Sequence, residues 1–258
     1  MPKHQNRKRF GQHFLTDQGV IEQIIHWVHP KKTDLLIEIG PGRGALTEPL
    51  LQQGFALSLI ELDRDLVTYW QQHRRQSQLS LWAGDVLNFN WNDLSPPYRL
   101  IGNLPYNIST PLLFMLLNTT NPFEDAHFML QKEVVDRMTA QPGHSEYGRL
   151  SVILQYAWMM EKLGNVPPEA FMPPPKVQSS VVRIIPKKKM THEAHDYNHF
   201  NQLVQQAFTH KRKILRSNLP HIPQALFKKL NIDTNRRAET LSVEEFVRLS
   251  NELLQQQV

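Results

Sequence analysis

The 258-residue sequence contains no cysteine, which excludes disulfide bonds, thiolate nucleophiles and cysteine-ligated zinc. It also lacks long apolar runs. The start, MPKHQNRKRFGQHFL, is basic without the apolar stretch of a signal peptide, and no later run reaches the roughly 20 residues of a membrane span. Internal repeats and low-complexity tracts are absent as well. We therefore expect a cytoplasmic protein without membrane contact, with one large and one small domain.

The net charge of +5 is unevenly placed along the chain. From Lys187 to the end, twelve Lys or Arg residues stand against seven Asp or Glu, whereas residues 10–186 hold thirteen bases against seventeen acids. Four further bases precede every acid: Lys3, Arg7, Lys8 and Arg9. Any single lysine is best interpreted as a solvated surface side chain. Two basic ends around an acidic-leaning middle nevertheless fit a polyanion laid across the protein, because clustered Lys and Arg bind phosphates.

Short β-rich runs alternate with helical segments through most of the chain. These runs lie at residues 35–40, 57–63, 79–86, 98–104 and 127–134. Strands that alternate with helices predict a parallel sheet with right-handed crossovers. Residues 151–164 and 179–186 are apolar enough to complete that sheet as an antiparallel pair.

The composition changes at a charged, proline-led connector that begins near residue 186. Beyond it, apolar residues recur at helical spacing from Phe200 to Phe208, which indicates a buried helix face rather than a binding motif. We place a domain boundary near Lys187. The predicted first domain covers residues 1–186, with a basic N-terminal segment at 1–16, and the predicted second domain is α-helical and covers 187–258.

A glycine-rich segment, EIGPGRGALT, follows the first predicted strand. Gly40, Gly42 and Gly44 allow a tight turn and let a ligand approach the N-terminus of a helix. The segment also fits the loose dinucleotide pattern Gly40-x-Gly42-x-x-Ala45, so an NAD site stays open at this point.

Acidic residues close the next two predicted strands. Glu61 follows Gly40 by twenty-one residues, where a carboxylate can accept both hydroxyls of an adenosine ribose. Asp85 ends the third strand and can accept a hydrogen bond from an adenine amino group. Together with the glycine-rich segment, these two strand ends indicate a nucleoside cofactor site.

The fourth strand runs into IGNLPYNIS, which sets a carboxamide and an aromatic ring at the edge where open α/β sheets bind ligands. The N6 atom of adenine is a poor nucleophile because its lone pair is delocalised into the ring. The Asn103 carboxamide and the Leu104 carbonyl can accept its hydrogens, while Pro105 stiffens the turn. The face of Tyr106, rather than its hydroxyl, can stack on an extruded base. Taken alone, the motif could be a plain strand-to-helix turn, but its place after the nucleoside signals favours methyl transfer.

The chain resembles the small-subunit (16S) ribosomal RNA adenine N6,N6-dimethyltransferase family of the KsgA type. The matching segments, in order, are FGQHFL, EIGPGRGALT, IELD, GDVL, IGNLPYNIST, FMPPPKVQSSVV and AFTHKRKILRSNL. The resemblance implies a Rossmann-like S-adenosylmethionine-dependent methyltransferase sheet with a small C-terminal α-helical domain that binds rRNA. It also implies dimethylation of two adjacent adenines near the 3′ end of 16S rRNA while the small subunit assembles, and we expect a monomer.

The same resemblance assigns individual roles. Tyr106 and Phe171 would sandwich the target base. The implied cofactor contacts are His13, Leu15, Gly40, Gly42, Glu61, Asp85 and Asn103. One position departs from the family, which usually has GQNFL where this chain has GQHFL. His13 keeps a hydrogen-bond donor through a ring nitrogen but is bulkier than asparagine.

Other conspicuous residues have plainer interpretations. His192, His195 and His199 have helical spacing, but no acid or cysteine completes a metal site, and we expect surface histidines and no metal. Arg212 and Arg216, expected on one helix face, suit phosphate binding and simple solvation about equally. Two rival functions remain to be tested: an RNA-binding assembly factor without chemistry, and a DNA adenine methyltransferase.

Overall fold

A computed structural model describes residues 13–73, 78–189 and 192–256. By its internal contacts the chain forms two compact units, one made of residues 1–135 and 161–186 and the other of residues 136–160 and 187–258. The division at Lys187 agrees with the change in composition. Residues 136–160 group with the C-terminal helices instead of with the sheet, because helix α6 (Arg149–Ala157) packs against helices α7 (Tyr197–Ala207) and α10 (Val243–Gln255). The functions predicted for the two ranges stay predictions.

The described residues form a seven-stranded sheet in the order β4-β3-β2-β5-β6-β9-β7. Its strands are β2 (Leu36–Ile39), β3 (Leu57–Glu61), β4 (Leu79–Ala83), β5 (Arg99–Asn103), β6 (Asp125–Gln131), β7 (Trp158–Val166) and β9 (Ser179–Pro186). The pairs β2·β3, β2·β5, β3·β4 and β5·β6 are parallel, and β6·β9 is antiparallel. Strand order reverses at β2, and open α/β sheets hold their ligand crevice at such a switch point.

A separate two-stranded sheet joins the N-terminal part of the chain to a distant segment. Strand β1 (Phe14–Leu15) pairs antiparallel with β8 (Phe171–Met172) in the register Phe14 to Met172 and Leu15 to Phe171. Leu15 and Phe171 are buried in the apolar cluster of the first unit. The basic segment at 1–16 was predicted as a unit, but Lys3, Arg7, Lys8 and Arg9 lie outside the described residues.

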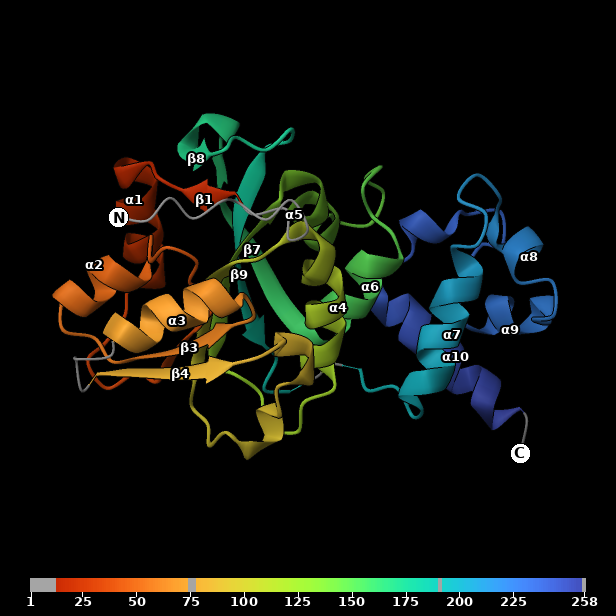
Figure 1. The fold of residues 1–258 in the computed structure, drawn as a ribbon. Coiled ribbons are helices and arrows are strands. Elements are labelled where there is room, and N and C mark those ends of the chain that lie inside the picture. The colour runs from red at the N-terminus through yellow and green to blue at the C-terminus, as the bar shows by residue number, and fades with distance from the viewer. Residues whose placement is uncertain (1–12, 74–77, 190–191, 257–258) are drawn as a thin grey trace. The chain divides into compact units, whose positions relative to one another are not determined.

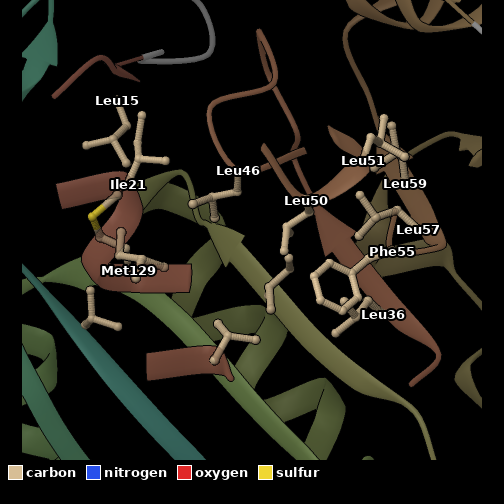
Figure 2. Packing of buried hydrophobic residues seen from close by; sticks show 14 of the residues in the cluster. Leu15, Ile21, Leu36, Leu46, Leu50, Leu51, Phe55, Leu57, Leu59 and Met129 are labelled. Carbon is tan, nitrogen blue, oxygen red and sulfur yellow. The ribbon is translucent and has the colours of Figure 1, made fainter. Parts of the chain in front are cut away.

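The helices of the first unit lie around the sheet in Figure 1 and bury apolar side chains such as Ile24, Leu50, Leu66 and Leu112. They are α1 (Gln18–Val28), α2 (Thr47–Gln52), α3 (Arg64–His73), α4 (Tyr106–Leu117) and the start of α5 (Lys132–Thr139), with short 3-10 turns at Val86–Asn88, Trp91–Asp93 and Pro168–Ala170. Figure 2 shows Leu50 and Phe55 beside Leu36 and Leu57 of the sheet. Burial of these apolar side chains is the main force that holds the glycine-rich segment before α2 against the sheet.

A buried ion-pair network fixes the amino-terminal ends of β5 and β6. The Arg99 guanidinium donates to both carboxylate oxygens of Asp125, through Nε at 2.7 Å and Nη2 at 2.8 Å, and to Asp34 at 2.7 Å. It also donates to the Val28 carbonyl at the end of α1. Because bidentate pairs of this kind are geometrically strict, β5 and β6 are held in register, and so is the opposite end of β5 at Asn103.

The second unit is helical apart from the start of β7. It contains α6, α7, α8 (Leu215–Asn218), α9 (Gln224–Lys229), a 3-10 turn at Ala238–Thr240 and α10. Figure 1 shows α7 and α10 side by side, and the two helices pack closely. The predicted apolar face of α7 is confirmed, since Phe200, Leu203, Val204 and Ala207 are all buried. Each of the two helices begins at a side-chain cap, Asp196 for α7 and Ser242 with Glu245 for α10.

Three details of the sequence-based prediction were wrong. Residues 151–157, expected in a strand, belong to α6, which is buried on nearly all sides, and β7 begins only at Trp158. The strand expected at 127–134 ends at Gln131, where α5 starts. Arg212 and Arg216 do not share a helix, because Arg212 lies in a turn and α8 begins at Leu215. Among the described residues, none of the helices combines the length and apolar character needed to cross a membrane.

Candidate active site

Four strand ends meet at one edge of the sheet because the strands that carry them run parallel. Gly40 follows β2, Glu61 ends β3, Asp85 comes two residues after β4, and Asn103 ends β5. A cavity opens at this edge. It is lined by His13, Phe14, Leu15, Glu38, Gly40, Pro41, Gly42, Arg43, Ala45, Leu46, Glu61, Leu66, Asn103, Leu104, Pro105, Tyr106 and Phe171. Every site residue predicted from the sequence is in this set except Asp85.

Asp85 has a different contact in this structure. Its carboxylate caps the short turn at Val86–Asn88 by accepting a hydrogen bond from the Leu87 amide at 3.0 Å. The preceding Gly84 amide donates to the Glu61 carbonyl at 2.9 Å, which keeps Asp85 next to the end of β3. The role of Asp85 toward an adenine ring stays a prediction.

The glycine-rich segment turns tightly above β2. Gly40, Gly42 and Gly44 have φ angles of +67°, +56° and +89°, which side chains other than glycine rarely adopt. A Cβ atom on Gly42 would also lie 3.3 Å from the ring of Phe14, so the segment closes directly under strand β1. Gly102 on β5 is constrained in another way, since a Cβ atom there would lie 2.6 Å from the Ile39 carbonyl oxygen. The backbones of β2 and β5 can approach this closely only because position 102 has no side chain.

Glu61 is a buried carboxylate held by backbone amides. Its Oε1 atom accepts from Leu62 and Asp63, both at 2.9 Å, and its Oε2 atom accepts from Gly42 at 3.3 Å. Burial raises the pKa of Glu61, while these three amides act in the opposite direction. The side chain is therefore fixed beside the glycine-rich segment, where the sequence predicted a ribose contact.

Glu38 is a second buried carboxylate in the cavity, and it was not predicted from the sequence. Only 2% of its surface is exposed, and Thr47 donates a hydrogen bond to its Oε2 atom at 2.6 Å. Burial and, to a smaller extent, the charge of Glu61 raise its pKa to about 7, against the opposite effect of the Thr47 bond. A single acid inside the apolar run LLIEIG was the signal in the sequence.

The NLPY segment forms the far wall of the cavity. Asn103 Nδ2 donates to the His13 carbonyl at 3.2 Å, and no hydrogen bond to Asn103 Oδ1 is found in the described part of the chain. The Leu104 amide donates to the Met129 carbonyl at 3.1 Å, which fixes the peptide that follows β5. Pro105 precedes α4, and Tyr106 is the first residue of that helix. Carboxamide, carbonyl and ring are thus positioned by rigid elements.

His13 directly precedes β1, and Phe171 belongs to β8, the strand that pairs with β1. The His13 ring stacks near the Tyr106 ring, with centroids 6.1 Å apart and an angle of 30° between the planes, and its Nδ1 atom donates to the Pro173 carbonyl at 2.8 Å. The side chain that departs from the family thus bonds to another part of the protein. Phe171 lines the cavity, yet only 3% of its surface is exposed. Its sandwich with Tyr106 around a base stays a prediction.

The three spaced histidines have separate partners. His192 lies 3.2 Å from Glu244, His199 Nδ1 lies 2.8 Å from the Ser250 hydroxyl, and the His195 amide donates to Asn251. Over the residues that the structure describes, no cluster of His, Asp or Glu is arranged to hold a metal ion.

Comparisons with known proteins identify a family for the whole chain. The profile of the family described as ribosomal RNA adenine dimethylase matches residues 3–255. Proteins named ribosomal RNA small subunit methyltransferase A are 50% identical in Nitrosospira multiformis, over 96% of both chains, and 50% identical in Chromobacterium violaceum, over 98% of this chain and 97% of the relative.

Two solved structures share the fold over nearly the full length. A dimethyladenosine transferase from Plasmodium falciparum superimposes with a TM-score of 0.80 at 26% identity, covering 95% of this chain and 99% of the other. The 23S rRNA methyltransferase ErmE superimposes with a TM-score of 0.74 at 21% identity, covering 93% and 99%. The predicted class, a Rossmann-like methyltransferase sheet with C-terminal helices, is confirmed.

Proposed function

Because the chain belongs to the ribosomal RNA adenine dimethylase family, we propose that it modifies two adjacent adenines near the 3′ end of 16S rRNA in the assembling small subunit. It is an S-adenosylmethionine-dependent enzyme that dimethylates adenine in small-subunit rRNA. The position of the two adenines, the assembly stage and the residue roles below belong to the proposal. So do a cytoplasmic location and a monomeric enzyme.

The cavity fits the cofactor in charge and in shape. Two buried carboxylates, Glu38 and Glu61, line the cavity, and burial raises the pKa of both side chains. A cationic ligand in the cavity would compensate their negative charge. Beside them the Gly42 amide and the turn at Gly40 leave room for a ligand to approach the backbone. In the proposed arrangement Glu61 holds the ribose hydroxyls, and Glu38 faces the positive end of the cofactor.

The hydrogen bond from Asn103 to the His13 carbonyl is the observation that carries the proposed mechanism. It commits Nδ2 of the carboxamide to the protein and thereby presents Oδ1 as an acceptor. An adenine N6 atom that donates its hydrogens to Asn103 Oδ1 and to the Leu104 carbonyl regains lone-pair density for attack. S-adenosylmethionine supplies a methyl group on a positively charged sulfur, which is already a good leaving group. No strong base is then required, because N6 releases a proton to solvent only once it is bonded to the methyl carbon and carries the positive charge. Positioning and electrostatics carry the reaction.

The Tyr106 ring completes the substrate side of the site. Base–aromatic stacking stabilises an extruded nucleotide by about 1–3 kcal/mol. Tyr106 lies in the wall next to Asn103, so a base on its face would bring N6 to the carboxamide. Basic residues of the helical unit, including Arg212 and Arg216, are exposed and available for rRNA phosphates.

One assay tests the proposal and its rivals together. The purified protein is given methyl-labelled S-adenosylmethionine with small subunits that lack N6-dimethyladenine, and in parallel with duplex DNA. We expect label only in the subunits, at two adjacent adenines near the 3′ end on mapping by mass spectrometry. Label in DNA would support the DNA methyltransferase, and binding to subunits without any transfer would support an assembly factor without chemistry. The molar mass of the free protein, measured by light scattering, tests whether the enzyme is a monomer.

A further inference from the structure

The hydroxyl group of Tyr106 has a partner that the sequence did not indicate. Its oxygen lies 3.1 Å from the hydroxyl oxygen of Ser179, the first residue of β9. Ser179 is 1% exposed and pairs with Gln131, the last residue of β6. This contact links the first turn of α4 to a strand 73 positions later in the chain.

The other end of Tyr106 is held as well. Its backbone carbonyl accepts a hydrogen bond from the Ser109 hydroxyl at 3.0 Å, and the residue before it is the conformationally restricted Pro105. An aromatic side chain fixed only at its backbone can still change its rotamer. A hydrogen bond from the far end of the ring removes that freedom before a base arrives.

We infer that Ser179 is a positioning residue, which holds the Tyr106 ring in the orientation that receives the target adenine. The inference rests on the proposed function, because it assigns Ser179 to the stacking step of that reaction. Pre-organisation of this kind lowers the cost of ordering a side chain upon binding. The expectation that only the ring face of Tyr106 matters is therefore incomplete, since the hydroxyl determines where that face lies.

The next residue of the strand provides a matched control. Ser180 is 0% exposed, and its hydroxyl donates to the Asn165 carboxamide oxygen at 2.8 Å, away from Tyr106. Successive strand residues point to opposite faces, so Ser179 and Ser180 share strand, chemistry and burial but differ in what they hold. A general effect of losing a buried hydroxyl would appear at both positions, whereas a positioning effect belongs to Ser179 alone.

The test is a double-mutant cycle on the full-length enzyme. Tyr106→Phe, Ser179→Ala, the double variant, Ser179→Thr and Ser180→Ala are compared for kcat/KM on unmethylated small subunits, for the affinity of S-adenosylhomocysteine by calorimetry, and for thermal unfolding. A hydrogen bond of ordinary strength predicts a loss of roughly two- to tenfold in kcat/KM for each single variant. We expect the double variant to lose the same factor and not its square. Ser179→Thr should restore activity, Ser180→Ala should be normal, and cofactor-product affinity should be unchanged throughout.

Several outcomes would overturn the inference. Losses that multiply in the double variant would show that the two hydroxyls act independently. An equal loss in Ser180→Ala, a normal rate in Ser179→Ala, or a fall in S-adenosylhomocysteine affinity would each remove the assigned role. An inactive wild-type protein would instead refute the proposed function, so the two failures are distinguishable.

Discussion

The carboxamide nitrogen of Asn103 lies 3.2 Å from the backbone carbonyl oxygen of His13 and donates a hydrogen bond to it. A residue at the end of β5 is thereby oriented by the residue that leads into β1. Because the bond uses the backbone of His13, it does not depend on which side chain occupies that position.

Asn103→Ala should lower the rate of methyl transfer by about 10²-fold or more, since loss of one positioned hydrogen-bonding group in an active site costs about that much. Cofactor affinity should fall only modestly. Single-turnover methylation at saturating S-adenosylmethionine measures the first quantity, and calorimetry measures the second. Asn103→Asp is the informative companion, because its carboxylate keeps an acceptor but would face the His13 carbonyl without a donor. Near-normal turnover of Asn103→Ala would contradict the role assigned to the carboxamide.

Tyr106→Ala should remove stacking worth about 1–3 kcal/mol. The loss should appear in kcat/KM for the RNA substrate, with the affinity for S-adenosylhomocysteine maintained. Tyr106→Trp, which keeps an aromatic face, should recover part of the activity. An alanine variant with normal kcat/KM would show that the base does not stack on this ring.

Glu38→Gln should change how stability depends on pH. Burial raises the pKa of Glu38 from 4.5 to about 7, so the folded protein holds a proton that the unfolded chain releases, and ionisation of Glu38 makes the wild type less stable as the pH rises from about 4.5 to about 7. The glutamine variant cannot ionise. Its free energy of unfolding relative to the wild type should therefore increase by an amount on the order of 3 kcal/mol between pH 4.5 and pH 8. Urea unfolding at the two pH values measures this difference, and an equal difference at both would contradict the raised pKa.

The same variant should bind the cofactor less well. Above pH 7 the wild-type carboxylate is ionised and faces a cationic ligand, whereas the glutamine is neutral. The affinity for S-adenosylmethionine should fall more than the affinity for S-adenosylhomocysteine, whose sulfur carries no charge. We therefore expect the Glu38→Gln variant to gain stability relative to the wild type as the pH rises, and to lose part of its preference for S-adenosylmethionine over S-adenosylhomocysteine.

Gly102→Ala should destabilise the first unit by roughly 1–3 kcal/mol, the usual cost of forcing extra atoms into a packed region. The added Cβ would lie 2.6 Å from the Ile39 carbonyl, a backbone atom that can move only if β2 and β5 separate. Gly148→Ala is the control, because nothing lies within 4 Å of its Cβ position and its backbone is extended. Gly148 is the N-cap of α6 and alanine is a poorer cap than glycine, so a loss of about 1 kcal/mol or less is expected there, confined to this helix end. Equal unfolding midpoints for both variants would contradict the strain at Gly102.

Neutralising Arg212 and Arg216 should weaken binding to small subunits in a salt-dependent way. Each lost phosphate contact should flatten the plot of log affinity against log salt concentration by roughly 0.7–0.9. Lys31→Gln removes an exposed charge before β2, at the edge of the sheet opposite the cavity, and should leave the slope unchanged. An unchanged slope for the arginine variants would show that these side chains face solvent.

The sequence was sufficient for the parts of the fold that follow a local pattern. The strand ends at Gly40, Glu61 and Asn103 could be ordered because parallel strands bring their carboxyl ends to one edge. Residues 151–157 could not be assigned in the same way, since a short apolar run suits a buried helix and a buried strand equally well. Only the packing of α6 against α7 and α10 decides between them.

The contacts of the site were less accessible to sequence reasoning because they join distant segments. Nothing near Tyr106 indicates that its hydroxyl meets Ser179, and nothing near His13 indicates that its carbonyl orients Asn103. Glu38 could have been identified from its acid within an apolar strand, but its raised pKa depends on burial that the sequence does not give. Pairs of this kind are set by tertiary structure alone.

The pairing of β1 with β8 has a consequence for how the protein is made. His13 reaches its partner Pro173 across 160 positions, and the wall of the cavity that β1 supplies has no strand to pair with until that later segment exists. At ordinary translation speeds of about 5–20 residues per second, the N-terminal segment must wait roughly 8–32 s for it. The glycine-rich segment and NLPY are both synthesised within that interval, before the strand that pairs with β1 exists. The wall of the cavity that β1 supplies can therefore be completed only after β8 has been synthesised, late in the synthesis of the first unit.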